Sequence, residues 1–308
     1  MLLDVLLNSN YTLNMKEYLS YYSAALFWNI PFIETVLDSI IDNTSKVNYT
    51  VTNKSERFLK KDKIIHLCEI DLPDNAVVLK DGILVASPEL VFLQLASCLD
   101  MHRLILLGLQ LCSHPPGKPS EAITTKQKLK TFIAKTPGHR GHRNASRAVK
   151  YIEDGSASIM ESIAYMILTL PHALGGYGLD GAVFNYEFML KDEAAKRLGQ
   201  KRCFVDLYYK KERLAVEYDS FAFHNRPMNQ GKDAIRSAIL ERHKIDVMHL
   251  STIQLYDKDA CKVFAFNLAS HLGKRMQIRA KKFDRMHALL RTLLPVEKQV
   301  NESDYGGF

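Results

Sequence analysis

Residues Lys201–Asn225 read KRCFVDLYYKKERLAVEYDSFAFHN, and this stretch predicts two short strands joined by a charged turn. Before the turn, apolar residues alternate with other types, and after it the run LAVEY is apolar and aromatic enough to lie inside a sheet. The turn itself is entirely charged. If it is symmetric about Lys211 and Glu212, the register places Asp206 directly opposite Glu217.

This register brings carboxylates together. Side chains directly opposed in a sheet have Cβ atoms about 4.5 to 5.5 Å apart, and like charges at such positions destabilise the pairing. Asp219 lies two residues beyond Glu217 and therefore on the same face. A divalent cation, Mg²⁺ or Mn²⁺, held by Asp206 and Glu217 would compensate this repulsion. The alternative is that these acids belong to an edge strand and face water.

Further polar residues flank the acidic hairpin in a characteristic order. A glutamate precedes it in the segment SIME, and a histidine and a D-x-x-R pair follow it, at Glu161, His224, Asp233 and Arg236. The order E, D, VEYDS, H, D-x-x-R resembles the very-short-patch-repair-like branch of the PD-(D/E)XK nuclease superfamily. The resemblance covers residues from Gly155 to about Leu255.

The resemblance implies a restriction-endonuclease-like mixed sheet flanked by helices, in the α+β or α/β class, and a metal-dependent DNA endonuclease of a defence or mobile-element system. It implies Asp206 and Glu217 as metal ligands and Glu161 as the acid beside the metal on the first helix. Asp219 stands where the superfamily has a lysine, so either His224 replaces that lysine or the site is catalytically weak. In the second case we expect a non-enzymatic regulator with a degenerate nuclease fold that binds DNA or a protein.

Each of these polar residues also has a purely structural explanation. Ser158 and Glu161 fit a capping box that opens a helix ending before Pro171. His224 is also compatible with a turn histidine whose ring is satisfied by the backbone. Asp233 and Arg236 are three residues apart on an expected helix and can pair with each other.

The first half of the chain predicts a smaller, mostly helical α/β domain. The segment Leu13–Phe27 has helix-compatible aromatic spacing, and Ser87-Pro88-Glu89 has the residue types that open a helix. The segments SAALFWNIPF and GILVASPELVFLQLA resemble the C-terminal part of abortive-infection antitoxins of the type IV toxin-antitoxin class. That resemblance covers about residues 20–110 and implies a protein partner for this domain.

Basic residues concentrate in two places. The stretch Ala122–Ile152 holds eight Lys and Arg residues and no acid, and Lys274–Leu294 predicts a basic amphipathic helix. Such surfaces give sequence-independent affinity for phosphates, although a solvated helix face is the alternative. We expect contacts with DNA from Arg140, Arg143, Arg147, Lys150, Arg236, Lys274 and Arg275.

Length and composition indicate the number of domains, the charge of the partner and the cellular compartment. Hydrophobic cores rarely grow beyond about 250 to 300 residues, so 308 residues predict two domains, 1–150 with a basic tail and 151–308. The formal charge of +7 favours a polyanionic partner. Five scattered cysteines without a CxxC motif indicate neither disulfides nor zinc and fit a cytoplasmic protein. We expect no export signal and no membrane span, and the sequence leaves the oligomeric state open.

Overall fold

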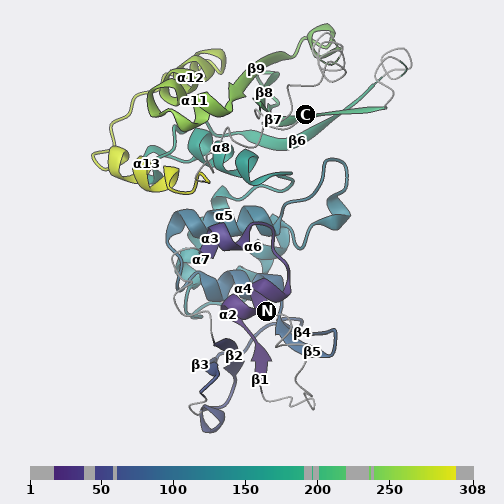
Figure 1. The fold of residues 1–308 in the computed structure, drawn as a ribbon, viewed down its shortest axis with the longest axis vertical. Coiled ribbons are helices and arrows are strands. Elements are labelled where there is room, and N and C mark those ends of the chain that lie inside the picture. The colour runs from purple at the N-terminus through teal and green to yellow at the C-terminus, as the bar shows by residue number, and fades with distance from the viewer. Residues whose placement is uncertain are drawn as a thin grey trace, which may run out of the picture.

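The computed structural model describes residues 17–37, 46–57, 61–190, 196, 201–219, 236 and 239–295. The predicted site residues His224 and Asp233 lie outside these ranges. Figure 1 shows an elongated molecule with a sheet at each end and a layer of helices between them. The described helices include none with the length and apolar character that a membrane crossing requires.

The N-terminal sheet has five strands in the order β3-β2-β1-β5-β4. Its central strand β1 pairs antiparallel with β2 and parallel with β5, so strands distant in sequence meet at β1. Asp81 and Gly82 form the tight turn between β4 and β5, both with positive φ. The strand bounds are β1 Glu17–Leu19, β2 Val47–Val51, β3 Lys63–Leu67, β4 Val77–Lys80 and β5 Ile83–Ala86.

The helical layer confirms one predicted helix start and corrects another. The Ser87 hydroxyl accepts a hydrogen bond from the Leu90 amide and so caps α4, as predicted. The expected helix over Leu13–Phe27 is confirmed from Tyr21 onward and wrong over residues 17–19, which form β1. The helices are α2 Tyr21–Phe27, α3 Ile33–Leu37, α4 Pro88–Leu95, α5 Met101–Leu111, α6 Lys126–Ala134 and α7 His142–Ala148. Short 3₁₀ turns are η2 Lys54–Glu56, η3 Pro119–Glu121, η4 Val149–Tyr151 and η5 His172–Leu174.

The C-terminal sheet is mixed and flanked by helices, as predicted. Its order is β6-β7-β8-β9, with antiparallel pairing up to β8 and parallel pairing between β8 and β9. The strands are β6 Ala182–Met189, β7 Arg202–Tyr209, β8 Leu214–Asp219 and β9 Asp246–Ser251. The helices are α8 Ile159–Thr169, α11 Thr252–Tyr256, α12 Lys258–His271 and α13 Phe283–Arg291.

The C-terminal basic segment is only partly helical. Residues 274–280 contain no helix, and α13 begins at Phe283, so the predicted helix from Lys274 to Leu294 is wrong over its first third. The Lys274 ammonium lies 2.7 Å from an Asp180 carboxylate oxygen and also bonds the Asp180 carbonyl. This pairing fixes the segment to the loop that precedes β6.

A single cluster of buried hydrophobic side chains connects the two sheets. It extends from Tyr18 in β1, through Leu104 in α5 and Ile163 in α8, to Leu293 after α13. Helix α8 therefore packs against α5 of the helical layer and against β7 and β8 of the C-terminal sheet. The division into domains near residue 150 stays a prediction.

Candidate active site

The β7–β8 hairpin has the register that its turn predicts. Leu207 on β7 pairs with Val216 on β8 in an antiparallel ladder. Arg213 closes the turn with a φ of 55°, in the left-handed region. The next residues beyond the Leu207–Val216 pair are Asp206 and Glu217, which are therefore neighbours on adjacent strands.

Asp206 lies at an irregularity in the sheet. The residues on either side of it pair regularly with β6, but Asp206 and Asn185 opposite it do not pair, and Asn185 has a φ of 42°. The register is the same on both sides of this break, so no residue is inserted and the distortion is confined to the Asn185 backbone. The Asp206 Oδ2 atom accepts a hydrogen bond of 2.8 Å from the Tyr218 backbone N–H on β8. The aspartate is thereby tied to the hairpin strand that carries Glu217.

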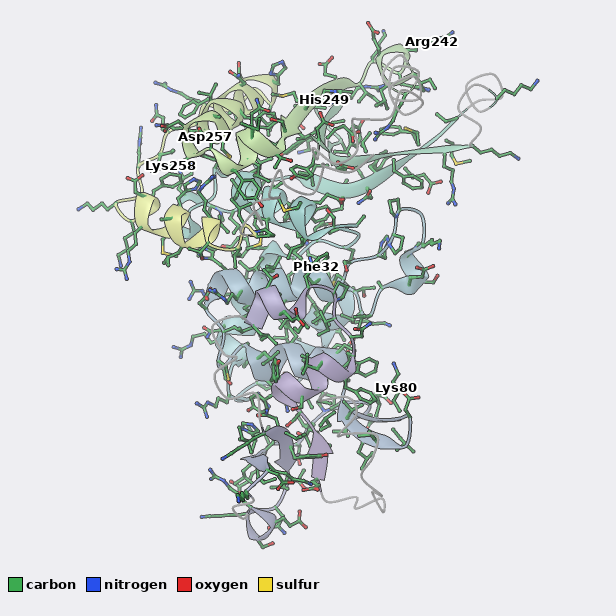
Figure 2. All side chains as sticks on the ribbon, viewed as in Figure 1. Phe32, Lys80, Arg242, His249, Asp257 and Lys258 are labelled. Carbon is green, nitrogen blue, oxygen red and sulfur yellow. The ribbon has the colours of Figure 1, made fainter. Side chains whose placement is uncertain are left out.

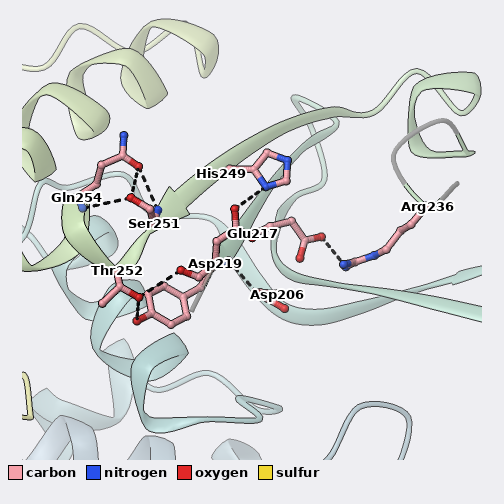
Figure 3. A network of polar contacts seen from close by, with 9 residues as sticks. Asp206, Glu217, Asp219, Arg236, His249, Ser251, Thr252 and Gln254 are labelled. Atoms are coloured by element: carbon pink, nitrogen blue, oxygen red, sulfur yellow. Dashed lines mark hydrogen bonds and ion pairs between the residues drawn. The ribbon is translucent and has the colours of Figure 1, made fainter. Parts of the chain in front are cut away.

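Glu217 is buried, with 6% of its surface exposed. Its Oε1 atom accepts a hydrogen bond of 2.6 Å from Arg236 Nη2 (Figure 3), and the same guanidinium donates to the carbonyl of Phe204 on β7. Arg236 thus bridges the two strands of the hairpin from outside it. The bonds to Glu217 and Phe204 place Arg236 within the acidic site. Its predicted pairing with Asp233 falls outside the described residues, and its contact with DNA stays a prediction.

Glu161 brings the first turn of α8 to the same place. The Ser158 hydroxyl accepts from the Glu161 amide at 3.1 Å, so Ser158 caps the helix as predicted. The Glu161 Oε2 atom accepts from the Ala157 amide at 3.0 Å and from the Asn185 side chain at 2.9 Å. The buried carboxylate therefore has both a capping role and a direct link to the irregularity opposite Asp206.

Asp206 repels both Glu217 and Glu161. Burial and the Asp206 charge raise the pKa of Glu217 to about 8, and Arg236 opposes this shift. Burial and the same Asp206 charge raise the pKa of Glu161 to about 7. Burial likewise raises the pKa of Asp206 itself, against the hydrogen bond from the Tyr218 amide and the charge of Arg236. The cluster thus has more negative charge than its neighbours compensate.

Asp219 faces a histidine that the sequence did not indicate. Strand β8 runs parallel to β9 with Glu217 beside His249, so these two side chains share one face of the sheet. The His249 Nδ1 atom donates to Asp219 Oδ2 at 3.0 Å. Figure 2 shows His249 at the end of the molecule formed by the C-terminal sheet, and Figure 3 shows its ring above Glu217. His224, which was expected to serve this site, lies outside the described residues.

The first turn of α11 holds the ends of β8 and β9 together. The Tyr218 hydroxyl lies 3.0 Å from Thr252 Oγ1, which donates in turn to the Asp219 carbonyl at 3.2 Å. Ser251 and Gln254 form a capping box that starts α11 directly after β9. These bonds fix the backbone that carries Asp219 and leave its side chain facing His249.

The free oxygens of the acid pair suit a hard cation. Asp206 Oδ1 and Glu217 Oε2 make no hydrogen bond with any described residue, whereas Asp206 Oδ2 and Glu217 Oε1 are occupied. The described side chains contain no set of three or more His, Cys, Asp or Glu residues arranged around one metal position. Mg²⁺ is often held by one or two carboxylates, with water and substrate phosphate completing the shell. Asp206 and Glu217 fit that donor set.

The predicted DNA-contacting residues are spread over several surfaces. Arg140, Arg143, Arg147 and Lys150 are exposed, and none of them has an ion-pair partner among the described residues. They lie around α7 in the helical layer (Figure 1). Arg275 is also exposed, whereas Lys274 is engaged by Asp180. The structure therefore does not gather all of these cations around the acids.

Comparisons with known proteins give no family assignment. The chain matches no protein-family model, and no curated protein or solved structure is significantly similar to it. What can be concluded about its function therefore comes from the geometry of the acidic site.

Proposed function

We propose that this chain is a metal-dependent endonuclease that hydrolyses phosphodiester bonds in DNA. The observation that carries the proposal is the placement of Asp206 and Glu217 side by side on antiparallel strands, with the buried Glu161 at the start of the neighbouring helix. A mixed sheet flanked by helices, with acids at these positions, is what the resemblance to the PD-(D/E)XK superfamily implies.

The acid pair supplies the oxygens for Mg²⁺ or Mn²⁺. When bound, such an ion would activate a water molecule and neutralise charge that develops on the scissile phosphate. Asp206 is held in position by the Tyr218 amide, and Glu217 by Arg236. Glu161, bonded to Asn185, fixes the irregular part of β6 that lies opposite Asp206.

Asp219 and His249 stand where the superfamily has a lysine. The Asp219 carboxylate binds the Nδ1–H of His249, which leaves Nε2 as the acceptor of the neutral ring. Because His249 is the register partner of Glu217, that acceptor lies on the face of the sheet that carries the metal ligands. We assign His249 the task of orienting the attacking water, in addition to the earlier candidate His224.

DNA is the polymer that the exposed cations favour. Arg143 and Arg147 are one helical turn apart on α7, and Lys150 follows on η4. Each is exposed and without an ion-pair partner among the described residues. Such cations bind phosphates without reading sequence, so they supply affinity and not specificity.

A second candidate, a non-enzymatic regulator with a degenerate nuclease site, is favoured by one contact. Arg236 already neutralises Glu217 at 2.6 Å, as a structural ion pair does. In this reading the acidic hairpin only stabilises the fold, and the basic surfaces bind DNA or a protein. Only the nuclease proposal predicts that removing a carboxylate stops a reaction. The regulator has no reaction to lose.

Metal-dependent cleavage of plasmid and single-stranded DNA tests the proposal. The wild type with Mg²⁺ or Mn²⁺ should cut, whereas Asp206→Asn and Glu217→Gln should lose at least about 100-fold in rate, since each removes a ligand charge. Glu212→Gln is the matched control, because Glu212 is an exposed carboxylate in the turn of the same hairpin. Equal activity in the wild type and Asp206→Asn would indicate a contaminating nuclease and favour the regulator.

A further inference from the structure

The N-terminal sheet carries a pocket that the nuclease proposal does not use. We propose that this pocket binds the phosphate group of a small molecule of about mononucleotide size. Its volume is about 400 Å³, within the range of about 300 to 1,000 Å³ typical of small-molecule sites. The residues on which the argument depends are Tyr21, Thr50, Arg57, His66, Gln94 and Arg140.

Two arginines from distant segments converge on the pocket. Arg57 follows η2 and Arg140 precedes α7, and the charges of both act on the ring of His66. Neither guanidinium has an ion-pair partner among the described residues, and the exposed Glu69 at the pocket edge pairs with neither of them. Guanidinium groups bind phosphate through paired N–H donors, so two of them at one cavity favour a dianionic phosphate.

The aromatic wall of the pocket is fixed on both sides. The rings of Tyr21 and His66 stack with centroids 3.9 Å apart and an interplanar angle of 26°. His66 Nε2 donates to Asn48 Oδ1 at 2.9 Å, and the Tyr21 amide donates to Gln94 Oε1 at 2.9 Å. Tyr21 has a φ of 48°, a strained conformation for a bulky residue and one that clusters at ligand sites. The backbone therefore holds an aromatic surface in a costly position beside two arginines.

A buried hydroxyl lines the same cavity. Thr50 is only 1% exposed, and its Oγ1 atom makes no hydrogen bond of normal geometry with any described residue, although the Tyr18 hydroxyl lies close to it. The Tyr18 and Thr50 hydroxyls lie next to each other beneath the pocket and put polar groups in its floor. A cavity of this volume suits a small molecule rather than the backbone of a DNA duplex.

The pocket is separate from the acidic site. Strands β2 and β3 lie at the opposite end of the molecule from β7 and β8 (Figure 1). Binding there is therefore expected to be independent of Asp206 and Glu217, and the two proposals can fail separately.

Ligand-dependent melting and calorimetry test this proposal with adenosine 5′-monophosphate, inorganic phosphate and, as the unphosphorylated control, adenosine. The wild type should be stabilised by at least one of the two phosphates and not by adenosine. Arg57→Gln and Arg140→Gln should each weaken binding about 10- to 100-fold, and the double variant should abolish it. Arg143→Gln, an exposed arginine on α7 outside the pocket, and Asp206→Asn should leave the affinity unchanged.

Two further measurements, a histidine titration and a duplex-binding assay, complete the test. Burial and the charges of Arg140 and Arg57 lower the pKa of His66 to about 4, so a bound phosphate should raise the pKa of this histidine in an NMR titration. A short DNA duplex is tested beside the small ligands. The proposal is overturned if neither phosphate binds the folded wild type, if the double variant binds as well as the wild type, or if only the duplex depends on the two arginines.

Discussion

Glu217 and Arg236 are 19 residues apart in the chain, yet their side chains meet at 2.6 Å and form an ion pair at the edge of the acidic hairpin. The glutamate is buried and the arginine is partly exposed, so the pair lies between the sheet interior and solvent. The arginine bonds only Glu217 among the three clustered carboxylates, although its charge also lowers the pKa of Asp206.

Removing the arginine should destabilise the fold when Glu217 is ionised. Arg236→Gln leaves a buried carboxylate without its cation, which should cost about 3 kcal/mol of unfolding free energy at pH 9. Urea denaturation of Arg236→Gln, Glu217→Gln and the double variant gives the coupling between the two residues. Additive effects of the two substitutions on the unfolding free energy would contradict the ion pair. The conservative variant Arg236→Lys should keep part of the stability.

The contribution of Glu161 and Glu217 to stability should fall as pH rises from about 5 to 8. Glutamates in the unfolded chain titrate near 4.5, whereas folding raises the pKa of Glu161 to about 7 and of Glu217 to about 8. Between these values the folded state binds more protons than the unfolded state, so raising the pH favours unfolding. Glu217→Gln should flatten this dependence in thermal melts recorded from pH 5 to 9. The same pH dependence in the wild type and in Glu217→Gln would contradict the raised pKa of Glu217.

A divalent cation should reverse that loss. At pH 8, millimolar Mg²⁺ or Mn²⁺ should raise the melting temperature, because binding to the native state stabilises it by mass action. At pH 5 the effect should be smaller, since protonated carboxyl groups do not bind metal. Asp206→Asn should remove the shift, whereas Glu212→Gln should keep it. The same shift in Asp206→Asn would place the cation elsewhere.

The sequence was sufficient where local patterns determine structure. The N-caps at Ser87 and Ser158 and the register of the β7–β8 hairpin all follow from residues close together in the chain. Asp206 and Glu217 were found this way, because an antiparallel hairpin with a short turn has a register that can be counted. The mixed character of the C-terminal sheet followed from the order of its elements.

The sequence did not predict structure that depends on pairing between distant segments. The strand Glu17–Leu19 is held by Val51 and Val85, and its aromatic spacing alone resembles that of a helix. His249 reaches Asp219 only because β9 joins β8 in parallel, and no local signal fixes that register. The available signal in the sequence was that His249 falls in an apolar segment with the character of a buried strand.

Binding to DNA should depend steeply on salt. Charge reversal at Arg143 and Arg147 should reduce the slope of log affinity against log salt by about 0.9 for each lost phosphate contact, measured by fluorescence anisotropy with a duplex. Lys118→Glu serves as the control, because Lys118 is exposed but already pairs with Glu121. An unchanged slope would mean that α7 presents an ordinary solvated face.

The hydrophobic cluster that runs from Tyr18 to Leu293 makes the two ends of the chain mechanically interdependent. A cut near residue 150 would expose the α5 surface on which α8 rests, and with it the helix that carries Glu161. The C-terminal half is therefore a poor candidate for expression by itself. Substitutions deep in the N-terminal half, far from Asp206 and Glu217, should disturb the acidic site through this shared core.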